Sequence, residues 1–367
     1  MNNPFRPQFG LKPKFFLERG AEEDEIISGL HKEYSPYHTT IISGVRGSGK
    51  TSLLDDVGAA LLNEKDWLII NVSDGNKLLR NIVEETVNEV NKLNKGVFNY
   101  LSKLNISILG MSIGLDLQTS RQDYGFQVGM QNILEVLAKH HLKLLITIDE
   151  IRNSKSLEEF ASAYQLFLRR KQPVYLVMAG LPKNVLSVLN NDVLTFLWRA
   201  KLIFLDNIDL PIVSETYRSL FAQRQTGFEA EALLYLTKLS LGYPYAYQLL
   251  GYYLWESCGA DITVAAVKAI ENKVKLDMYN KVIGIIYHKL TRIEKDFLMA
   301  IAQAGMVVKI ATIITKLGKS KSYIANYTLR LKDAGLIKKV SHTELTFTIP
   351  FMREYLLEQQ QIDNFAM

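Results

Sequence analysis

The segment GVRGSGKT, residues 44–51, places two glycines, a lysine and a threonine at fixed spacing. It satisfies G-x-x-x-x-G-K-[ST], in which glycines let backbone N–H groups turn toward a phosphate, lysine reaches the outer phosphate oxygens and the hydroxyl can ligate magnesium. A chance match in a glycine-rich turn is the alternative. The apolar run before the segment and the helical pattern after it favour a phosphate-binding loop. The loop residues would be Gly44, Arg46, Gly47, Ser48, Gly49, Lys50 and Thr51.

A second pattern, KLLITIDE at residues 143–150, is an apolar strand that ends on two carboxylates. Asp149 would hold Mg²⁺ through water, and Glu150 would orient or deprotonate a water that attacks the γ-phosphate. Carboxylates at a strand end can also cap a helix or simply face solvent. Together with the loop, the pattern predicts hydrolysis of ATP with Mg²⁺ as cofactor, in which Lys50 is needed for binding and Glu150 for the chemical step.

The elements that would position these residues alternate along the chain. Short apolar runs without polar alternation are separated by helical patterns, which favours a parallel sheet covered on both faces, the α/β fold of a P-loop NTPase. The expected strands lie at 39–44, 67–72, 143–150, 174–180 and 201–205. NISILGMSIGLDL alternates and contains glycines, so a hairpin-like insertion is expected at about 96–128. From 211 onward only helical patterns follow until the C-terminal part of the chain.

Length and pattern together predict several domains, since 367 residues exceed one ordinary domain. The expected divisions are an N-terminal lead at 1–38, an ATPase core at 39–210, a helical lid at 211–284, a winged helix-turn-helix at 285–358 and a tail at 359–367. No run of about 20 apolar residues is present, so we expect no membrane span. One cysteine and no signal-peptide pattern favour the cytoplasm.

With these motifs, the chain resembles the initiator-like branch of the AAA+ ATPases and the neighbouring STAND-type and archaeal ATPases. The arginine-glycine filling of GVRGSGKT and the leading NPF and FLERG segments carry this resemblance, as do FLWRA before KLIFL and the stretch LGYPYAYQLLG. The resemblance implies that the lead lies over an adenine, that Arg199 is an arginine finger or sensor, and that Gly242 and Pro244 approach the nucleotide. It also implies a homo-oligomer assembled through ATP interfaces. Arg199 could instead be merely solvated, and Pro244 could merely start a helix.

The sequence departs from the family where strand 174–180 ends. Many relatives place a polar sensor there, whereas this chain has Ala179 and Gly180, and Asn184 is the nearest polar candidate. Slow hydrolysis is therefore expected.

Residues 285–358, called here the C-terminal module, hold 12 Lys/Arg against 6 Asp/Glu, a net +6 in a chain of net +5. Helical patterns at 291–305, 309–318 and 320–335, two strands within 336–350 and a final helix predict a winged helix-turn-helix. On its third helix Ile324, Thr328 and Leu331 share the core-facing side. The predicted DNA contacts are Lys319, Lys321, Tyr323, Asn326, Tyr327, Arg330, Lys338 and Lys339.

Three functions remain open at this point. The first is an ATP-dependent DNA-binding protein whose nucleotide state controls DNA engagement or assembly. The second is a STAND-like switch whose winged helix binds a protein partner, because winged helices also mediate protein contacts. A metabolic kinase ranks last, because nothing resembles a site for an acceptor substrate.

Overall fold

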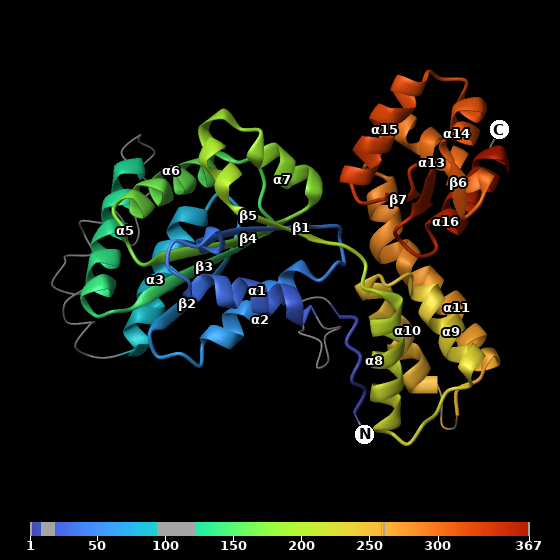
Figure 1. Ribbon diagram of the computed structural model, residues 1–367, viewed down its shortest axis with the longest axis horizontal. Coiled ribbons are helices and arrows are strands. Elements are labelled where there is room, and N and C mark those ends of the chain that lie inside the picture. Colours follow the sequence, from blue (N-terminus) through green and yellow to red (C-terminus); the bar gives the residue numbers. More distant parts are fainter. Residues whose placement is uncertain (1, 9–18, 94–121, 258, 260, 366–367) are drawn as a thin grey trace. The chain divides into compact units, whose positions relative to one another are not determined.

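The computed structural model describes residues 2–8, 19–93, 122–257, 259 and 261–365 (Figure 1). The chain divides into two compact units. Unit 1 comprises Met1–Glu18, Val45–Gly49 and Leu205–Met367, and unit 2 comprises Arg19–Gly44 and Lys50–Phe204. In the described part of the chain no helix is long and apolar enough to cross a membrane.

Unit 2 alternates strands and helices. Its strands are β1 (Thr39–Gly44), β2 (Trp67–Ser73), β3 (Lys143–Asp149), β4 (Val174–Gly180) and β5 (Lys201–Leu205), the last residue of which belongs to unit 1. Its α-helices are α1 (Gly20–His31), α2 (Lys50–Leu61), α3 (Leu78–Leu93), α5 (Gln122–Lys139), α6 (Lys155–Arg169) and α7 (Pro182–Leu189). Two 3₁₀ helices are η1 (Pro36–His38) and η3 (Asp192–Arg199).

The strands form one parallel sheet in the order β2-β3-β4-β1-β5. The predicted α/β fold with a parallel sheet is confirmed. Alternate residues of β3 point to opposite faces of the sheet. Leu144, Ile146 and Ile148 belong to a core that they share with α3, α5, α6 and α7. Leu145 is also buried but lies outside that core. Helices α1 and α2 lie on the other side of the sheet from α6 and α7 (Figure 1). Burial on both faces explains why these strands are apolar without alternation.

The structure corrects two predictions that the sequence made for unit 2. The expected strand 143–150 stops at Asp149, because Glu150 adopts a left-handed backbone (φ +56°) that cannot continue a strand. Residues 122–128 of the expected insertion are not hairpin-like but form the first part of α5, and Phe126 and Met130 of that helix join the core of unit 2. The rest of that insertion lies outside the described residues.

Unit 1 is mainly helical. Its helices before residue 290 are α8 (Leu210–Ala222), α9 (Ala230–Ser240), α10 (Pro244–Ser257), α11 (Val264–Met278), the π-helix η4 (Tyr279–Ile283) and α12 (Gly284–Tyr287). The later elements are α13 (Arg292–Ala304), β6 (Val307–Lys309), α14 (Ile310–Leu317), α15 (Lys321–Asp333), β7 (Ile337–Ser341), β8 (Glu344–Phe347) and α16 (Met352–Phe365). The three strands form an antiparallel sheet in the order β6-β8-β7.

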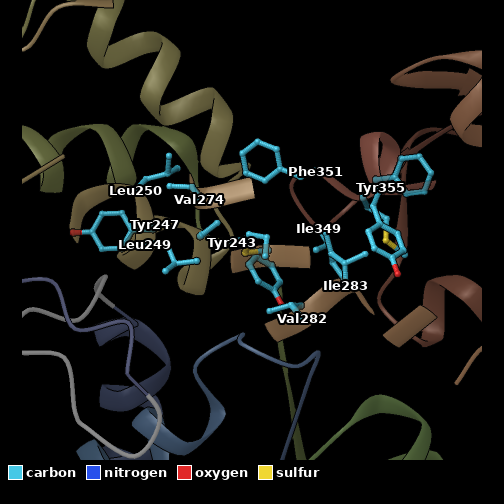
Figure 2. Close-up of a cluster of buried hydrophobic side chains, with 14 of the residues drawn as sticks. Tyr243, Tyr247, Leu249, Leu250, Val274, Val282, Ile283, Ile349, Phe351 and Tyr355 are labelled. Atoms are coloured by element: carbon cyan, nitrogen blue, oxygen red, sulfur yellow. The ribbon is translucent and has the colours of Figure 1, made fainter. Parts of the chain in front are cut away.

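One hydrophobic core runs through unit 1, from α8 to α16. Figure 2 shows its middle part, where Tyr243, which precedes α10, gathers with Tyr247 of α10, Ile283 of η4, and Phe351 and Tyr355 near the C-terminus. The expected boundary at residue 284 therefore does not separate two cores. It falls inside a continuous helical stretch formed by α11, η4 and α12.

The three helices α13, α14 and α15, the strands β7 and β8 and the final helix α16 of the C-terminal module follow in the order that the sequence predicted, with β6 added between α13 and α14. Strand β6 was not predicted because three residues carry too little pattern, and it forms by pairing with β8. The expected tail at 359–367 is helical as far as Phe365. The helix continues because no glycine or proline interrupts it and because the side chain of Gln303 donates to Gln360 Oε1 (2.8 Å).

Candidate nucleotide and nucleic-acid sites

The predicted phosphate loop connects the end of β1 to the start of α2. Gly47 (φ +76°) and Gly49 (φ +91°) have left-handed backbones, and Ser48 N donates to Val45 O (3.2 Å) across the turn. Side chains disfavour such a backbone, so glycine is needed where the loop must turn its N–H groups inward. In sequence α2 begins directly after this turn, so the order of strand, glycine turn and helix that a phosphate loop needs is present.

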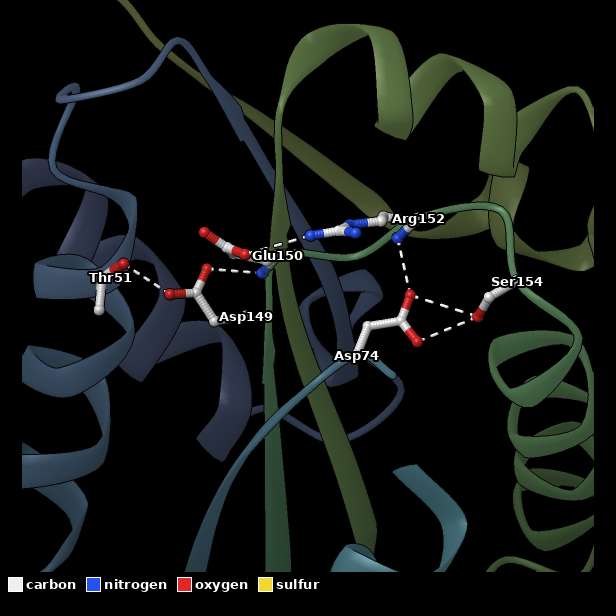
Figure 3. Close-up of polar contacts among 6 residues, drawn as sticks. All are labelled: Thr51, Asp74, Asp149, Glu150, Arg152 and Ser154. Atoms are coloured by element: carbon white, nitrogen blue, oxygen red, sulfur yellow. Dashed lines mark hydrogen bonds and ion pairs between the residues drawn. The ribbon is translucent and has the colours of Figure 1, made fainter. Parts of the chain in front are cut away.

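Unit 2 brings the start of α2 next to the end of β3 (Figure 3). The Thr51 hydroxyl donates to Asp149 Oδ2 at 2.5 Å, although 98 residues separate the two in sequence. Mg²⁺ prefers oxygen ligands and leaves several positions to water and phosphates, so a hydroxyl beside one carboxylate fits this ion. Among the described residues there is no group of three or more His, Cys, Asp or Glu side chains that could hold a metal alone.

Glu150 follows Asp149 and points into solvent, with a side chain that is 71% exposed. Its backbone N–H donates to Asp149 Oδ1 (2.7 Å), and its carboxylate lies 3.5 Å from the Arg152 guanidinium. An exposed carboxylate therefore lies beside the Thr51–Asp149 pair (Figure 3).

Sequence reasoning missed Asp74 and Ser154, which bond to each other beside this site. Asp74 directly follows β2, and Ser154 caps α6. The signal that could have found Asp74 is its position after an apolar strand, since the carboxyl ends of parallel strands meet at one edge of the sheet.

The end of β4 explains the missing polar sensor. A Cβ atom on Gly180 would lie 2.7 Å from Ile151 Cγ1, so a side chain cannot occupy this position without displacing Ile151. Ile151 is fully buried, and its N–H donates to Ala179 O (2.9 Å). The strand end therefore anchors the segment after Asp149. Asn184 lies one turn into α7 and is partly exposed.

Arg199 is the last residue of η3 and is exposed. Its side chain makes no hydrogen bond or ion pair within the described part of the chain. The neighbouring Trp198 is 59% exposed, and Phe204 on the edge strand β5 is 65% exposed. The structure thus leaves Arg199 on an open surface of unit 2 and assigns it no partner within that unit.

In unit 1, Tyr243 contacts the phosphate loop. Its hydroxyl donates to Arg46 O, and burial raises its pKa, so the hydroxyl keeps the proton that it donates. Tyr243 and Tyr245 also pack against Gly47, where an added Cβ would lie 3.0 and 3.1 Å from them. Gly242 and Pro244 flank Tyr243. Gly242 contacts the backbone of Ile208, and Pro244 is buried as the first residue of α10.

Comparisons with solved structures extend over almost the whole chain. The Walker-type ATPase paby2304 of Pyrococcus abyssi is similar at 15% identity, with 94% of this chain and 96% of that chain covered and a TM-score of 0.60. The Aeropyrum pernix ORC2 protein, in ADPNP-ADP complexes, is similar at 13% identity, with 97% and 98% covered and a TM-score of 0.59. The chain has an AAA+-like P-loop NTPase fold. At such identities the similarity establishes the fold alone.

Two comparisons of the sequence with known families and proteins do not identify a function. The profile of a domain of unknown function, DUF8462, matches residues 280–356, which is most of the C-terminal module. A search of curated proteins gave no significant match.

The C-terminal module places the predicted contact residues on α15 and β7, except for Lys319, which precedes α15. Ile324, Thr328 and Leu331 of α15 are buried as predicted. Tyr323 and Tyr327 are half-buried and lie 4.7 Å apart between ring centroids. The exposed members of the predicted set are Lys319, Lys321, Asn326, Arg330, Lys338 and Lys339.

Arg330 differs from the other exposed residues of α15 because it has a partner inside the module. Its Nε lies 2.8 Å from Glu294 Oε1, and the Glu294 side chain is only 10% exposed. The same glutamate closes the capping box of α13 with Thr291. Arg330 therefore neutralises a nearly buried carboxylate, a role that the sequence did not reveal.

Proposed function

We propose that this protein binds ATP together with Mg²⁺ and hydrolyses it, and that its C-terminal module is a winged helix that binds DNA under the control of the nucleotide. The hydrogen bond between Thr51 and Asp149 carries the ATPase part, because it joins the phosphate loop motif to an acidic strand end on a P-loop NTPase fold. The ADPNP-ADP complexes of the Aeropyrum pernix protein, which shares this fold, support it.

The residues divide the reaction among them. The loop 44–49 and Lys50 would bind the phosphates, Thr51 and Asp149 would hold Mg²⁺, and Glu150 would accept a proton from the attacking water. The water oxygen joins the γ-phosphorus while the bond from that phosphorus to the β–γ bridging oxygen breaks, releasing ADP. Bound Mg²⁺ would neutralise phosphate charge. Arg199, exposed and unpaired within unit 2, is proposed to approach a γ-phosphate bound by another copy of the chain.

Two substitutions test the ATPase. Lys50→Ala should abolish nucleotide binding, measured with a fluorescent ATP analogue. Glu150→Gln should keep that affinity and lose phosphate release, because only proton acceptance is removed. Wild-type turnover in Glu150→Gln would show that Glu150 has no such role.

The DNA part rests on the exposed lysines of α15 and the β7–β8 hairpin within a module of net charge +6. If about four to six phosphates are contacted, log affinity for duplex should fall with log salt at a slope near −4 to −5. Replacing Lys338 and Lys339 by alanine should make that slope shallower by about two, because two phosphate contacts are lost. The matched control removes Lys65 and Lys77, two exposed lysines of unit 2. Binding that ignores salt would contradict the proposal.

Arg330→Ala is a poor probe of DNA contact, because it also strips Glu294 of its partner. Asn326→Ala is cleaner, since Asn326 is exposed and its loss leaves the core of α15 untouched. In a mobility-shift titration on random duplex, with and without ATP, Asn326→Ala should weaken binding while thermal stability stays unchanged.

A protein partner for the module remains the second proposal. Five apolar side chains on it are 43–56% exposed and favour this interpretation: Ile293, Met306, Val307, Leu329 and Val340. ATP-dependent oligomers that form equally with and without DNA would favour a STAND-like switch in place of the DNA-binding protein. For either function, the single cysteine supports placing the protein in the cytoplasm.

A further inference from the structure

Asp74 makes several hydrogen bonds close to Asp149 and Glu150 (Figure 3). It lies one residue beyond β2, and its backbone N–H donates to Asp149 O (3.1 Å). Its Oδ2 accepts from Arg152 N (2.8 Å), and its Oδ1 accepts from Ser154 Oγ (3.0 Å). The backbone of Asp74 thus joins the ends of two neighbouring strands, and its carboxylate joins them to the segment that leads from β3 into α6.

This segment, residues 150–154, begins with a backbone that would not hold itself in place. Glu150 has a left-handed φ of +56°, which is unfavourable for a residue with a side chain. Such a conformation persists only when its surroundings fix it. Beside the bond from Glu150 N to Asp149 Oδ1 (2.7 Å), two bonds to other elements do so. Ile151 N donates to Ala179 O of β4 (2.9 Å), and Arg152 N donates to Asp74 Oδ2 (2.8 Å).

The position of Glu150 therefore depends on Asp74. One hydrogen bond, from Ile151 N to Ala179 O, fixes only one point of the segment. The second hydrogen bond, from Arg152 N to Asp74, also fixes the direction in which the segment runs. A carboxylate is a suitable acceptor, because hydrogen bonds to an ionised group are stronger than those between neutral groups. The Arg152 guanidinium, 3.5 Å from Glu150, lies on the same restrained segment.

We propose that Asp74 is a positioning residue for Glu150 in ATP hydrolysis, holding the backbone of residues 150–154 so that the Glu150 carboxylate meets the attacking water. The proposal rests on the proposed ATPase function. Helix capping alone does not account for Asp74, because Ser154 itself accepts from Leu157 N (3.1 Å) as the cap of α6. Asp74 instead contacts the backbone two residues from Glu150.

The test compares Asp74→Asn with Glu150→Gln and the double variant. Asparagine keeps the shape and can still reach both partners, but it is uncharged, so the charge-assisted bond that the carboxylate accepts from Arg152 N becomes a weaker neutral one. Asp74→Asn should lower kcat about 10- to 100-fold, since a small misplacement of a reacting group is costly, and leave the affinity for a fluorescent ATP analogue unchanged. In the Glu150→Gln background it should cause no further loss, because it acts through Glu150. Glu85→Gln, an exposed acid on α3, is the control for charge.

Several outcomes would contradict the positioning role of Asp74. Wild-type kcat in Asp74→Asn, or an equal further loss in the Glu150→Gln background, overturns the positioning role. A lower melting temperature with unchanged kcat per folded molecule overturns it too, since it shows a purely structural role. If Asp74→Asn does not fold, Ser154→Ala, which removes one of the two contacts, should lower kcat with unchanged affinity, and normal kcat there contradicts the proposal. Turnover that stays at the wild-type level in Glu150→Gln overturns the role of Glu150, and that of Asp74 with it, whereas a wild type that releases no phosphate from ATP overturns the ATPase assignment.

Discussion

Gly242 shows how a single residue can be fixed by the backbone around it. Its φ is +72°, and an added Cβ would lie 1.9 Å from Ile208 O. The two residues also share a backbone hydrogen bond, Ile208 N to Gly242 O (2.8 Å). The family resemblance assigned Gly242 to the nucleotide, whereas the structure of unit 1 supplies a packing reason for the same glycine.

Gly242→Ala should therefore lower the free energy of unfolding by about 2 kcal/mol or more, because strained backbone and a backbone clash add together. Urea denaturation measures this. Gly20→Ala is the matched control, since nothing lies within 4 Å of a Cβ at that helical position. It should be neutral or slightly stabilising. Equal stability of Gly242→Ala and wild type would show that the segment relaxes.

His31 gives a pH-dependent contribution at the same scale. Its Nε2 lies 2.9 Å from Glu64 Oε2, and this hydrogen bond raises the pKa of His31 above its usual 6.5. The charged form is favoured by folding, so the stabilisation is fully present below about pH 6.5 and is lost as the pH rises through the raised value. Glu64→Gln should destabilise the protein at pH 6 and much less at pH 9, by urea denaturation at both. A difference independent of pH would contradict the ion pair.

At the scale of elements, the described N-terminal residues 2–8 are held on the helices of unit 1. Phe5 is 2% exposed and lies among Tyr217, Phe221, Tyr247 and Trp255, with ring centroids 5.5 to 6.2 Å away. Gly251 of α10 makes room, since its Cβ would lie 2.3 Å from Phe5. Arg6 N donates to Gln248 Oε1 (2.9 Å). These residues pack on α8 and α10, which the sequence did not indicate.

Phe5→Ala should lower the free energy of unfolding by about 3 to 5 kcal/mol, because it empties a space enclosed by four aromatic rings. The control is Asn2→Ala, three residues earlier and exposed. Urea denaturation followed by fluorescence reports on this cluster through Trp255. An effect of Phe5→Ala no larger than that of Asn2→Ala would mean that the segment is not held in solution.

At the scale of the whole molecule, nucleotide binding should appear as a gain in stability. A ligand that binds only the folded protein adds about 2.7 kcal/mol when present at 100 times its Kd. ATP with Mg²⁺ should therefore raise the melting temperature of the wild type in a concentration-dependent way. Lys50→Ala should show no such rise, and Glu150→Gln should show the full one. A rise of equal size in Lys50→Ala would place the nucleotide elsewhere.

The sequence by itself determined the sheet, the loop and most helices. Strands buried on both faces must be continuously apolar, and a phosphate loop needs glycines and a lysine at fixed spacing, so local composition carries both signals. The same holds for Asp149 and Glu150 at a strand end, and for the buried face of α15. These features depend on neighbours within one element, which periodicity and spacing can report.

Only the tertiary structure decided which distant residues meet. Asp74 joins Arg152 and Ser154 across 78 and 80 residues, Phe5 reaches α10, and Arg330 pairs with Glu294 of another helix. Gly180 and Gly242 are explained by Ile151 and Ile208, neither of which is a sequence neighbour. Such contacts leave no local signal, because one side chain specifies neither its partner nor the space around it. They arise only when the sheet order and the helix packing bring the two segments together.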